Sequence, residues 1–279
     1  MPTLLGIDIG TSSAKAAVVD AETARVLASA GREVALHTPR PGWAEQDPAG
    51  WFDAAVEASR AALAAAGVDG ASVAGIGFSG QMHGTVCLGA DGDPVRPAII
   101  WADARSGPQA SALRAQIDAA ELLMHAPGPP VAGFMGPTWL WLREHEPRTV
   151  ERTAALLLPK DAVRLRFTGE IATEVSDAAS TWLLDIASGA WSGRLCEWCG
   201  VPREALPPLL RSAEAAGRLR AEVAAALGVR AGIPVAAGAA DQPAQALGHG
   251  LLHPGVDSVT IGTGGPVFPP LAPPHGHPG

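Results

Sequence analysis

The chain has 279 residues, a length typical of two domains or of one large domain. With 47% hydrophobic and 17% charged residues it is too apolar for an intrinsically disordered protein, and its three cysteines are too few for a disulfide framework. The net charge of −8 argues against a nucleic-acid-binding surface and against a basic patch that would bind a membrane.

The first residues are predicted to form strands. They do not resemble a signal peptide, because no basic region precedes them and Asp8 interrupts the apolar run. No apolar run in the chain is long enough for a membrane-spanning helix, so we expect a cytoplasmic protein. Short turns separate three strand-like runs, which indicates an antiparallel meander of Thr3–Ile9, Ala14–Val19 and Val26–Leu36.

A helix is predicted after the meander. Asp47 can cap its first turn, Pro48 suits the first helical position, and Gly67 suits the end. Between them one face repeats at helical spacing, with Trp51, Ala55, Ala58, Ala62 and Ala66. Val73–Phe78 then reads as a strand, and the order strand, helix, strand predicts a right-handed parallel crossover. The fold class is therefore α/β, with a mixed sheet in which three antiparallel strands lead into parallel α/β units.

Strands and helices continue to alternate along the rest of the chain. Further strands are predicted at Ala98–Trp101, Ala154–Leu158, Pro234–Ala237 and Asp257–Ile261. Further helices are predicted at Pro137–Glu146, Lys160–Phe167, Arg220–Leu227 and Gln242–Leu247. The Pro-rich residues 269–279 fit neither a helix nor a central strand.

The first candidate site follows the first strand. Asp8 stands near the strand end, and Gly10, Thr11 and Ser12 form the turn after it. A carboxylate beside such a turn can hold a hydrated cation, while the backbone N–H groups of the turn can bind phosphate. An ordinary hairpin turn is the alternative. A Walker loop is excluded, because no Gly-Lys-Ser/Thr follows.

The second candidate site follows the strand Val73–Phe78. Gln81, Met82 and His83 lie just beyond its carboxyl end, which is where open α/β sheets bind ligands. Glutamine and histidine can bind sugar hydroxyls, although a structural histidine is the alternative. Trp101, beside Asp103, could pack against the face of a sugar.

The third candidate is Asp241, which follows a Gly-rich strand end and precedes a predicted helix. A carboxylate in this position could cap the helix, or it could remove the proton from a bound hydroxyl. The sequence leaves both roles open.

These motifs, in this order, resemble the FGGY carbohydrate kinases over nearly the whole chain. The matching segments are Gly6–Ser12, Trp43–Pro48, Gly80–Gly84, Arg96–Arg105, Leu158–Asp161, Ser176–Ala179, Gly238–Gln242 and Ile261–Gly264. The most specific is Gln81-Met82-His83-Gly84, which looks like the branch of this family that acts on xylulose rather than the branch that acts on glycerol.

The resemblance implies an actin-like ATPase fold of two ribonuclease H-like domains, with sugar bound in the first and ATP with Mg²⁺ mainly on the second. It implies that Asp241 is the catalytic base and that Asp8 binds the metal. The implied sugar contacts are Gln81, Met82 and His83, together with Trp101 and Asp103. The implied phosphate contacts are Gly10, Thr11, Ser12, Thr263 and Gly264.

The resemblance also implies a longer chain with a complete second domain. We expect residues 1–247 to form the sugar-binding domain and residues 248–279 to begin a nucleotide-binding domain that is truncated in a Pro-rich end. The expected activity is ATP-dependent phosphorylation of D-xylulose to D-xylulose 5-phosphate, impaired by the truncation.

Other functions stay open on the sequence alone. They are a kinase for another ketose or polyol, and a catalytically inactive fragment that only binds sugar or a partner protein. The sequence also leaves open whether the chain forms a homodimer. A chaperone-like or structural ATPase of the actin type is disfavoured, because Gln81, His83 and Asp241 would have no evident purpose in one.

Overall fold

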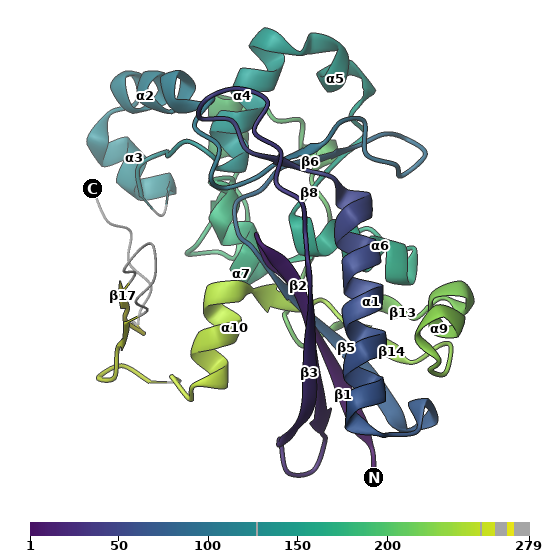
Figure 1. The fold of residues 1–279 in the computed structure, drawn as a ribbon. Coiled ribbons are helices and arrows are strands. Elements are labelled where there is room, and N and C mark those ends of the chain that lie inside the picture. Colours follow the sequence, from purple (N-terminus) through teal and green to yellow (C-terminus); the bar gives the residue numbers. More distant parts are fainter. Residues whose placement is uncertain (127, 252, 260–266, 271–279) are drawn as a thin grey trace.

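The computed structural model describes residues 1–126, 128–251, 253–259 and 267–270 (Figure 1). Its centre is a mixed sheet in the order β13-β14-β5-β1-β2-β3, and β15 also pairs with β5. β1 (Thr3–Ile9), β2 (Ser13–Asp20) and β3 (Val26–Glu33) pair antiparallel in sequence order, as predicted for the meander. The other strands of the sheet are β5 (Val73–Gly80), β13 (Ala215–Arg218), β14 (Pro234–Ala236) and β15 (Ala239–Ala240).

The predicted helix is α1 (Pro48–Ala66), with the expected boundaries. The Asp47 carboxylate accepts a hydrogen bond from the Ala49 N–H at 2.9 Å, and Gly67 ends the helix at φ 63°. α1 packs along β2 and β3 and buries Trp51 completely (Figure 1). The chain then returns to the sheet as β5, which pairs parallel with β1 rather than with β3, so the crossover passes over two strands.

Three helices cover one face of the sheet and enclose the main core. They are α1, α6 (Pro159–Thr168) and α9 (Ala221–Leu227), and the two later helices match the predicted ones. Alternate residues of β1, such as Leu5 and Ile7, are buried against this side. The opposite face is more open, as the 43% exposure of Leu4 shows.

A second core lies among helices inserted between the strands. These helices are α2 (Gly107–Gln116), α3 (Ala119–His125), α4 (Met135–His145), α5 (Pro147–Arg152) and α8 (Gly193–Cys199). α4 was predicted, whereas the others were not. The core is rich in tryptophan, with Trp139 and Trp182 almost fully buried.

Short strands pair in twos outside the central sheet. They are β4 (Glu45–Gln46), β6 (Val86–Leu88), β7 (Ala98–Ile99), β8 (Ala155–Leu157), β9 (Thr173–Glu174), β10 (Leu184–Asp185), β11 (Ala190–Trp191) and β12 (Leu209–Leu210). The predicted strands Ala98–Trp101 and Ala154–Leu158 correspond to β7 and β8, which are shorter than expected.

The last described elements are α7 (Val175–Ala178), α10 (Asp241–Gly248) and the small hairpin of β16 (Ser258–Val259) and β17 (Val267–Phe268). The predicted strand Asp257–Ile261 is represented by β16, and its last two residues lie outside the described part of the chain. Within the described residues, no helix is both long and apolar enough to cross a membrane.

Candidate active site

Three parallel strands end side by side at one edge of the central sheet. On β1 and β5, Ile9 lies opposite Gly80, and on β15, Ala240 also lies opposite Gly80. Ile9, Gly80 and Ala240 are the last residues of these three strands. The residues that follow, Gln81 and Asp241, therefore lie beside the turn that follows β1. The carboxyl ends of parallel strands are the usual place for a ligand in an open sheet. The register therefore gathers the three candidate sites of the sequence into one.

The approach of β15 to β5 depends on Gly238. This residue has φ 88°, and a Cβ at its position would collide with the carbonyl oxygen of Phe78. A residue with a side chain would therefore be strained twice, by its backbone angle and by the contact. Gly238 thus allows Asp241 to reach the strand edge.

Asp241 is the first residue of α10, and the N-cap is Ala240, so the alternative that Asp241 caps the helix is wrong. Its side chain is half-buried, and Oδ1 has no hydrogen-bond partner among the described residues. Burial raises the pKa of Asp241 above its usual value; the Gln242 N–H opposes this shift, and the nearby charge of Asp8 adds to it. A half-buried carboxylate with raised pKa and an unused oxygen is suited to accept a proton.

The turn after β1 lies next to this carboxylate. Gly10 N–H donates to Ser13 O at 3.1 Å and closes the turn, and a Cβ at Gly10 would lie 2.9 Å from that oxygen. Asp8 Oδ1 accepts a hydrogen bond from Ser79 Oγ at 2.7 Å, while Asp8 Oδ2 lies toward the turn. In the turn itself, Ser12 is exposed.

The residues at this turn suit magnesium. Among the described residues, no group of three or more His, Cys, Asp or Glu side chains is arranged so that it could hold a metal ion. Mg²⁺ commonly takes one or two carboxylates and completes its shell with phosphate oxygens and water. Asp8, with one oxygen fixed by Ser79, matches that requirement. The roles of Asp8 and of residues 10–12 stay predictions.

A chain of hydrogen bonds joins the turn to the predicted sugar residues. Thr11 Oγ1 donates to Gln81 Oε1 at 3.2 Å and accepts from the Trp101 indole N–H at 2.8 Å. Gln81 Nε2 and Trp51 Nε1 both donate to Gln46 Oε1, at 2.9 and 3.2 Å. Gln81 is buried, so its amide positions the turn. Trp101 is half exposed, and its indole N–H is held by Thr11.

His83 follows Gln81 and the half-buried Met82. Its ring stacks on Phe134 with centroids 4.0 Å apart, and Nδ1 lies 2.7 Å from the carbonyl oxygen of Ser180. Because a carbonyl only accepts, Nδ1 carries the proton and Nε2 is left as an acceptor. Burial lowers the pKa of His83, against the opposing effect of the Ser180 carbonyl, so the ring is neutral near pH 7. A neutral ring with Nε2 as acceptor suits a sugar hydroxyl.

Asp103 does not fit its predicted sugar contact. Its side chain is buried, and its two oxygens accept hydrogen bonds from the Ala44 N–H at 2.6 Å and from Arg105 at 2.8–3.0 Å. Arg105 also pairs with Glu45 at 2.8 Å. These bonds occupy the lone pairs that a sugar hydroxyl would need. The geometry supports Asp103 as a residue that fixes the loop after Trp101.

The predicted phosphate residues Thr263 and Gly264 lie outside the described part of the chain.

A buried charge cluster lies behind this edge, and the sequence assigned no role to it. It consists of Lys160, Asp161, Glu174 and Asp177, all with fully buried side chains. Burial raises the pKa of Asp177 to about 7; the Lys160 charge opposes this shift, and the charges of Asp161 and Glu174 add to it. The sequence signals were the segments Leu158–Asp161 and Ser176–Ala179, which match the family and contain three of these residues but received no role.

This pKa predicts a pH dependence of stability. The folded state retains a proton on Asp177 between about pH 4 and pH 7, where the unfolded chain has lost it. Protonation of Asp177 therefore contributes fully to the free energy of unfolding below about pH 4, and this contribution is lost as the pH rises to about 7. Over that range the free energy of unfolding falls by at most about 1.4 kcal/mol per pH unit. We expect Asp177→Asn to lack this slope in urea unfolding across that range. Equal slopes for both proteins would contradict the assignment.

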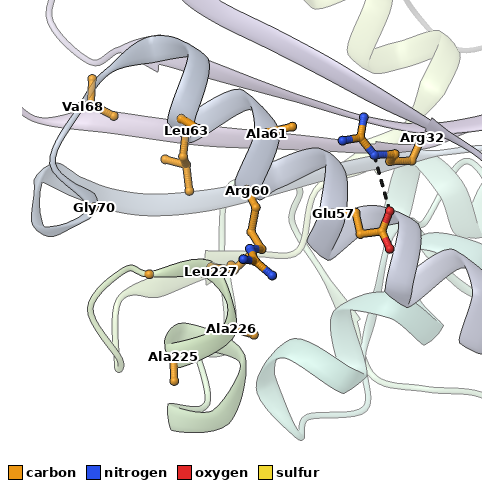
Figure 2. Close-up of a pocket in the computed structure, with 12 residues that line it drawn as sticks. Arg32, Glu57, Arg60, Ala61, Leu63, Val68, Gly70, Ala225, Ala226 and Leu227 are labelled. Carbon is orange, nitrogen blue, oxygen red and sulfur yellow. Dashed lines mark ion pairs between the residues drawn. The ribbon is translucent and has the colours of Figure 1, made fainter.

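The hollow between α1 and α9 is a separate feature. Its volume is about 780 Å³, and its lining includes Arg32, Glu57 and Arg60 (Figure 2). None of the predicted site residues lines it. A second hollow of about 590 Å³ lies on the open face of the sheet and is lined in part by Asp8, Ser79 and Gly238. The second hollow, and not the first, adjoins the strand edge described above.

Comparison with known proteins agrees with this arrangement. Residues 3–248 match the N-terminal domain of the FGGY family of carbohydrate kinases. The chain is 38% identical over 268 residues to a xylulose kinase of Bacillus subtilis (strain 168), a match covering 96% of the chain and 53% of that protein. It is 36% identical over 264 residues to a xylulose kinase of Escherichia coli (strain K12), covering 95% of the chain and 53% of that protein.

A crystal structure of a xylulose kinase from Rhodospirillum rubrum matches with a TM-score of 0.89 at 32% identity, over 95% of this chain and 54% of that one. The predicted actin-like ATPase fold, with its mixed sheet, is confirmed by this likeness. The chain spans about half the length of the curated relatives that it matches. Its sequence and structure together show that it belongs to the FGGY family of carbohydrate kinases.

Proposed function

We propose that this chain carries the sugar site and the catalytic base of a kinase that phosphorylates D-xylulose with ATP to D-xylulose 5-phosphate. The observation that carries the proposal is the register of β1, β5 and β15, in which Asp8 lies opposite Ser79 and Ala240 opposite Gly80. Asp8 therefore lies at the strand edge beyond which the chain continues to His83 and to Asp241. The xylulose kinases of Bacillus subtilis and Escherichia coli support the choice of sugar.

In the proposed reaction, Asp241 accepts the proton of the sugar hydroxyl while the hydroxyl oxygen attacks the γ-phosphorus of ATP. The bond from that phosphorus to the β–γ bridging oxygen breaks, and ADP leaves. Phosphoryl transfer depends mainly on positioning and on neutralising charge. Bound Mg²⁺ would neutralise phosphate charge, and Asp8 would hold it. The raised pKa of Asp241 strengthens it as a proton acceptor.

The sugar is proposed to lie between His83 and Trp101. His83 Nε2 accepts a hydrogen bond from a sugar hydroxyl, because Nδ1 is committed to Ser180. Trp101, half exposed and tethered through its indole N–H to Thr11, offers its ring to the apolar face of the sugar. This hydrogen bond connects Trp101, at the proposed sugar site, to Thr11, in the turn proposed to bind phosphate.

We expect His83→Ala to weaken xylulose binding by about 1–3 kcal/mol, the usual cost of removing one partner of a buried polar contact. Isothermal titration calorimetry with xylulose measures the change. The matched control is His145→Ala, because His145 also stacks on an aromatic ring, Trp141, and its Nδ1 also lies near a backbone carbonyl, at 3.1 Å. The control should leave the affinity unchanged. Unchanged affinity in His83→Ala would instead make His83 a purely structural residue.

Turnover tests the proposal as a whole. The chain spans about half the length of its relatives, so turnover is to be measured with the natural gene product that contains this sequence, called the full-length protein below. The assay couples ADP release to NADH oxidation, with ATP and Mg²⁺ and with or without D-xylulose. ADP release that requires xylulose supports the proposal, and ADP release that ignores xylulose contradicts it.

A further inference from the structure

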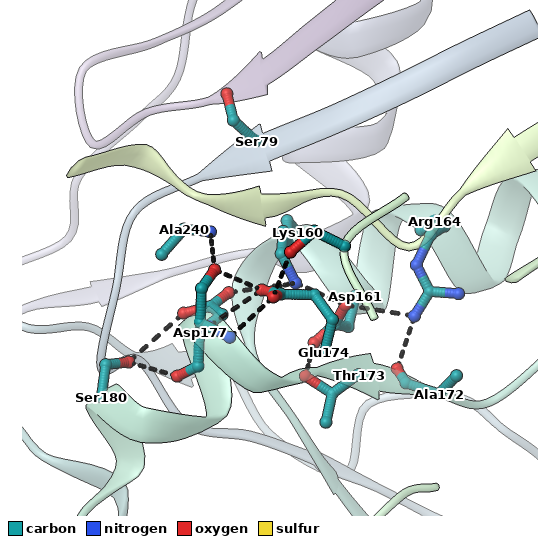
Figure 3. A network of polar contacts seen from close by, with 12 residues as sticks. Ser79, Lys160, Asp161, Arg164, Ala172, Thr173, Glu174, Asp177, Ser180 and Ala240 are labelled. Carbon is teal, nitrogen blue, oxygen red and sulfur yellow. Dashed lines mark hydrogen bonds and ion pairs between the residues drawn. The ribbon is translucent and has the colours of Figure 1, made fainter. Parts of the chain in front are cut away.

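The buried charge cluster behind the site is unusual in its composition. Lys160 Nζ lies 2.8 Å from Asp161 Oδ1, 3.2 Å from Asp177 Oδ2 and 3.5 Å from Glu174 Oε1, and all four side chains are fully buried (Figure 3). Burial disfavours the charged ammonium, yet the three carboxylates outweigh this effect and raise the pKa of Lys160 above its usual value. Such a cluster is costly to bury, which calls for a reason beyond stability.

On one side, the cluster is hydrogen-bonded through Ser176 to the backbone next to Asp241, the proposed catalytic base. Ser176 Oγ donates to Glu174 Oε1 at 2.9 Å and accepts from the Ala240 N–H at 3.1 Å. Ala240 is the N-cap of α10 and directly precedes Asp241. The charged group therefore holds, through one hydroxyl, the backbone that carries the Asp241 carboxylate.

On the other side, the cluster is hydrogen-bonded through Ser180 to His83, the proposed sugar contact. Ser180 Oγ donates to Asp177 O at 2.6 Å, lies 3.3 Å from Asp177 Oδ1, and accepts from the His83 N–H at 3.1 Å. His83 has φ 68°, a left-handed conformation that non-glycine residues adopt only when their surroundings hold them in it. Ser180 supplies that restraint at two points, the N–H and Nδ1. Lys160 therefore contacts both Glu174, which is linked through Ser176 to the backbone before Asp241, and Asp177, which is linked through Ser180 to His83.

We propose that Lys160, Glu174 and Asp177 form a positioning cluster that sets the separation between Asp241 and His83, acting through Ser176 on one side and Ser180 on the other. This inference rests on the proposed function. Its members have fully buried side chains and act through the two serines, so they are positioning residues. A shift of about 1 Å between base and hydroxyl can cost up to about 100-fold in rate, so a rigid support of this kind has a large effect.

The test uses Ser176→Ala in the full-length protein, with Ser212→Ala as matched control. Ser212 Oγ also donates to Glu174, to Oε2 at 3.0 Å, whereas the Ala240 N–H donates to Ser176 Oγ and not to Ser212. We expect Ser176→Ala to lower kcat about tenfold and to leave KM for xylulose within about threefold, because base placement and not sugar binding is disturbed. Ser212→Ala should keep kcat, and Ser176→Thr, which retains the hydroxyl, should restore it.

At Ser180 we expect the opposite kinetic effect, a change in KM for xylulose and a smaller change in kcat. Ser180→Ala should raise KM for xylulose about tenfold, because the His83 backbone loses one of its restraints, while kcat changes less. Equal losses of kcat in Ser176→Ala and Ser212→Ala would overturn the positioning role. So would a Ser180→Ala protein that binds xylulose normally.

A measurement without substrate separates this inference from the proposed function. Amide hydrogen exchange at Ala240, followed by NMR, should accelerate in Ser176→Ala and stay unchanged in Ser212→Ala. Unchanged exchange in both variants overturns the inference. A wild-type protein that turns over no xylulose contradicts the proposed function, and the exchange rates still decide whether the cluster holds the Asp241 backbone.

Discussion

We expect Asp241→Asn to lower kcat for D-xylulose by about 10²–10⁴, the range that a general base contributes. The amide keeps the shape of the carboxylate but cannot accept the hydroxyl proton. Xylulose affinity should change little, because the sugar contacts are assigned to His83 and Trp101. The raised pKa and the unpartnered Oδ1 of Asp241 are the structural reasons for choosing this carboxylate.

Two measurements check this expectation. Coupled ADP release gives kcat, and calorimetry gives xylulose affinity for the same variant. Asp93→Asn, at an exposed loop carboxylate, is the control and should behave as wild type. A kcat for Asp241→Asn within about threefold of wild type would contradict the role as base, since the smallest contribution expected is about 100-fold.

Lys160→Met should have the largest effect on stability. The substitution leaves Asp161, Glu174 and Asp177 buried together without the ammonium that compensates them. Removing one partner of a buried ion pair typically costs about 3–5 kcal/mol, so the free energy of unfolding should fall by that amount. Lys15→Met, at an exposed position, should change it by less than about 0.5 kcal/mol.

Urea unfolding followed by circular dichroism measures both variants. The double variant Lys160→Met with Asp177→Asn should recover part of the loss, because one buried carboxylate is removed along with its cation. If Lys160→Met unfolds at the wild-type urea concentration, then Lys160 is not the charge that holds the cluster together. Recovery in the double variant links the stability loss to charge rather than to the lost volume.

The sheet and its first helix could be predicted because their signals are local. Asp47, Pro48 and Gly67 mark both ends of α1, and the structure uses them as capping rules describe. The helices α2, α3, α5, α7 and α8 were missed. α2, for example, has a serine at its N-cap, Ser106, and a proline in its first turn, but it buries only two apolar residues, Ala110 and Leu113, so no apolar face repeats clearly along it. Strands of two residues, such as β4 and β7, are too short to show any periodicity.

The candidate site could be predicted only in part, for a related reason. Each strand end was visible in the sequence, but the pairing of Gly80 with both Ile9 and Ala240 depends on the register of distant strands. The burial of Asp103 against Arg105 is likewise a product of the fold. A residue such as Asp103 beside an exposed tryptophan has the same sequence signal whether it contacts a sugar or supports a loop.

Sugar dependence of ADP release by the full-length protein tests the central claim most directly. The claim is that the strand edge around His83 and Asp241 binds xylulose and activates its hydroxyl. With ATP and Mg²⁺ present, we predict that D-xylulose gives the highest kcat/KM among D-xylulose, D-ribulose, glycerol and gluconate, by about tenfold or more, as expected when polar groups are matched to one substrate. Equal kcat/KM for all four, or a higher value for glycerol or gluconate, would contradict the assignment of this site to xylulose.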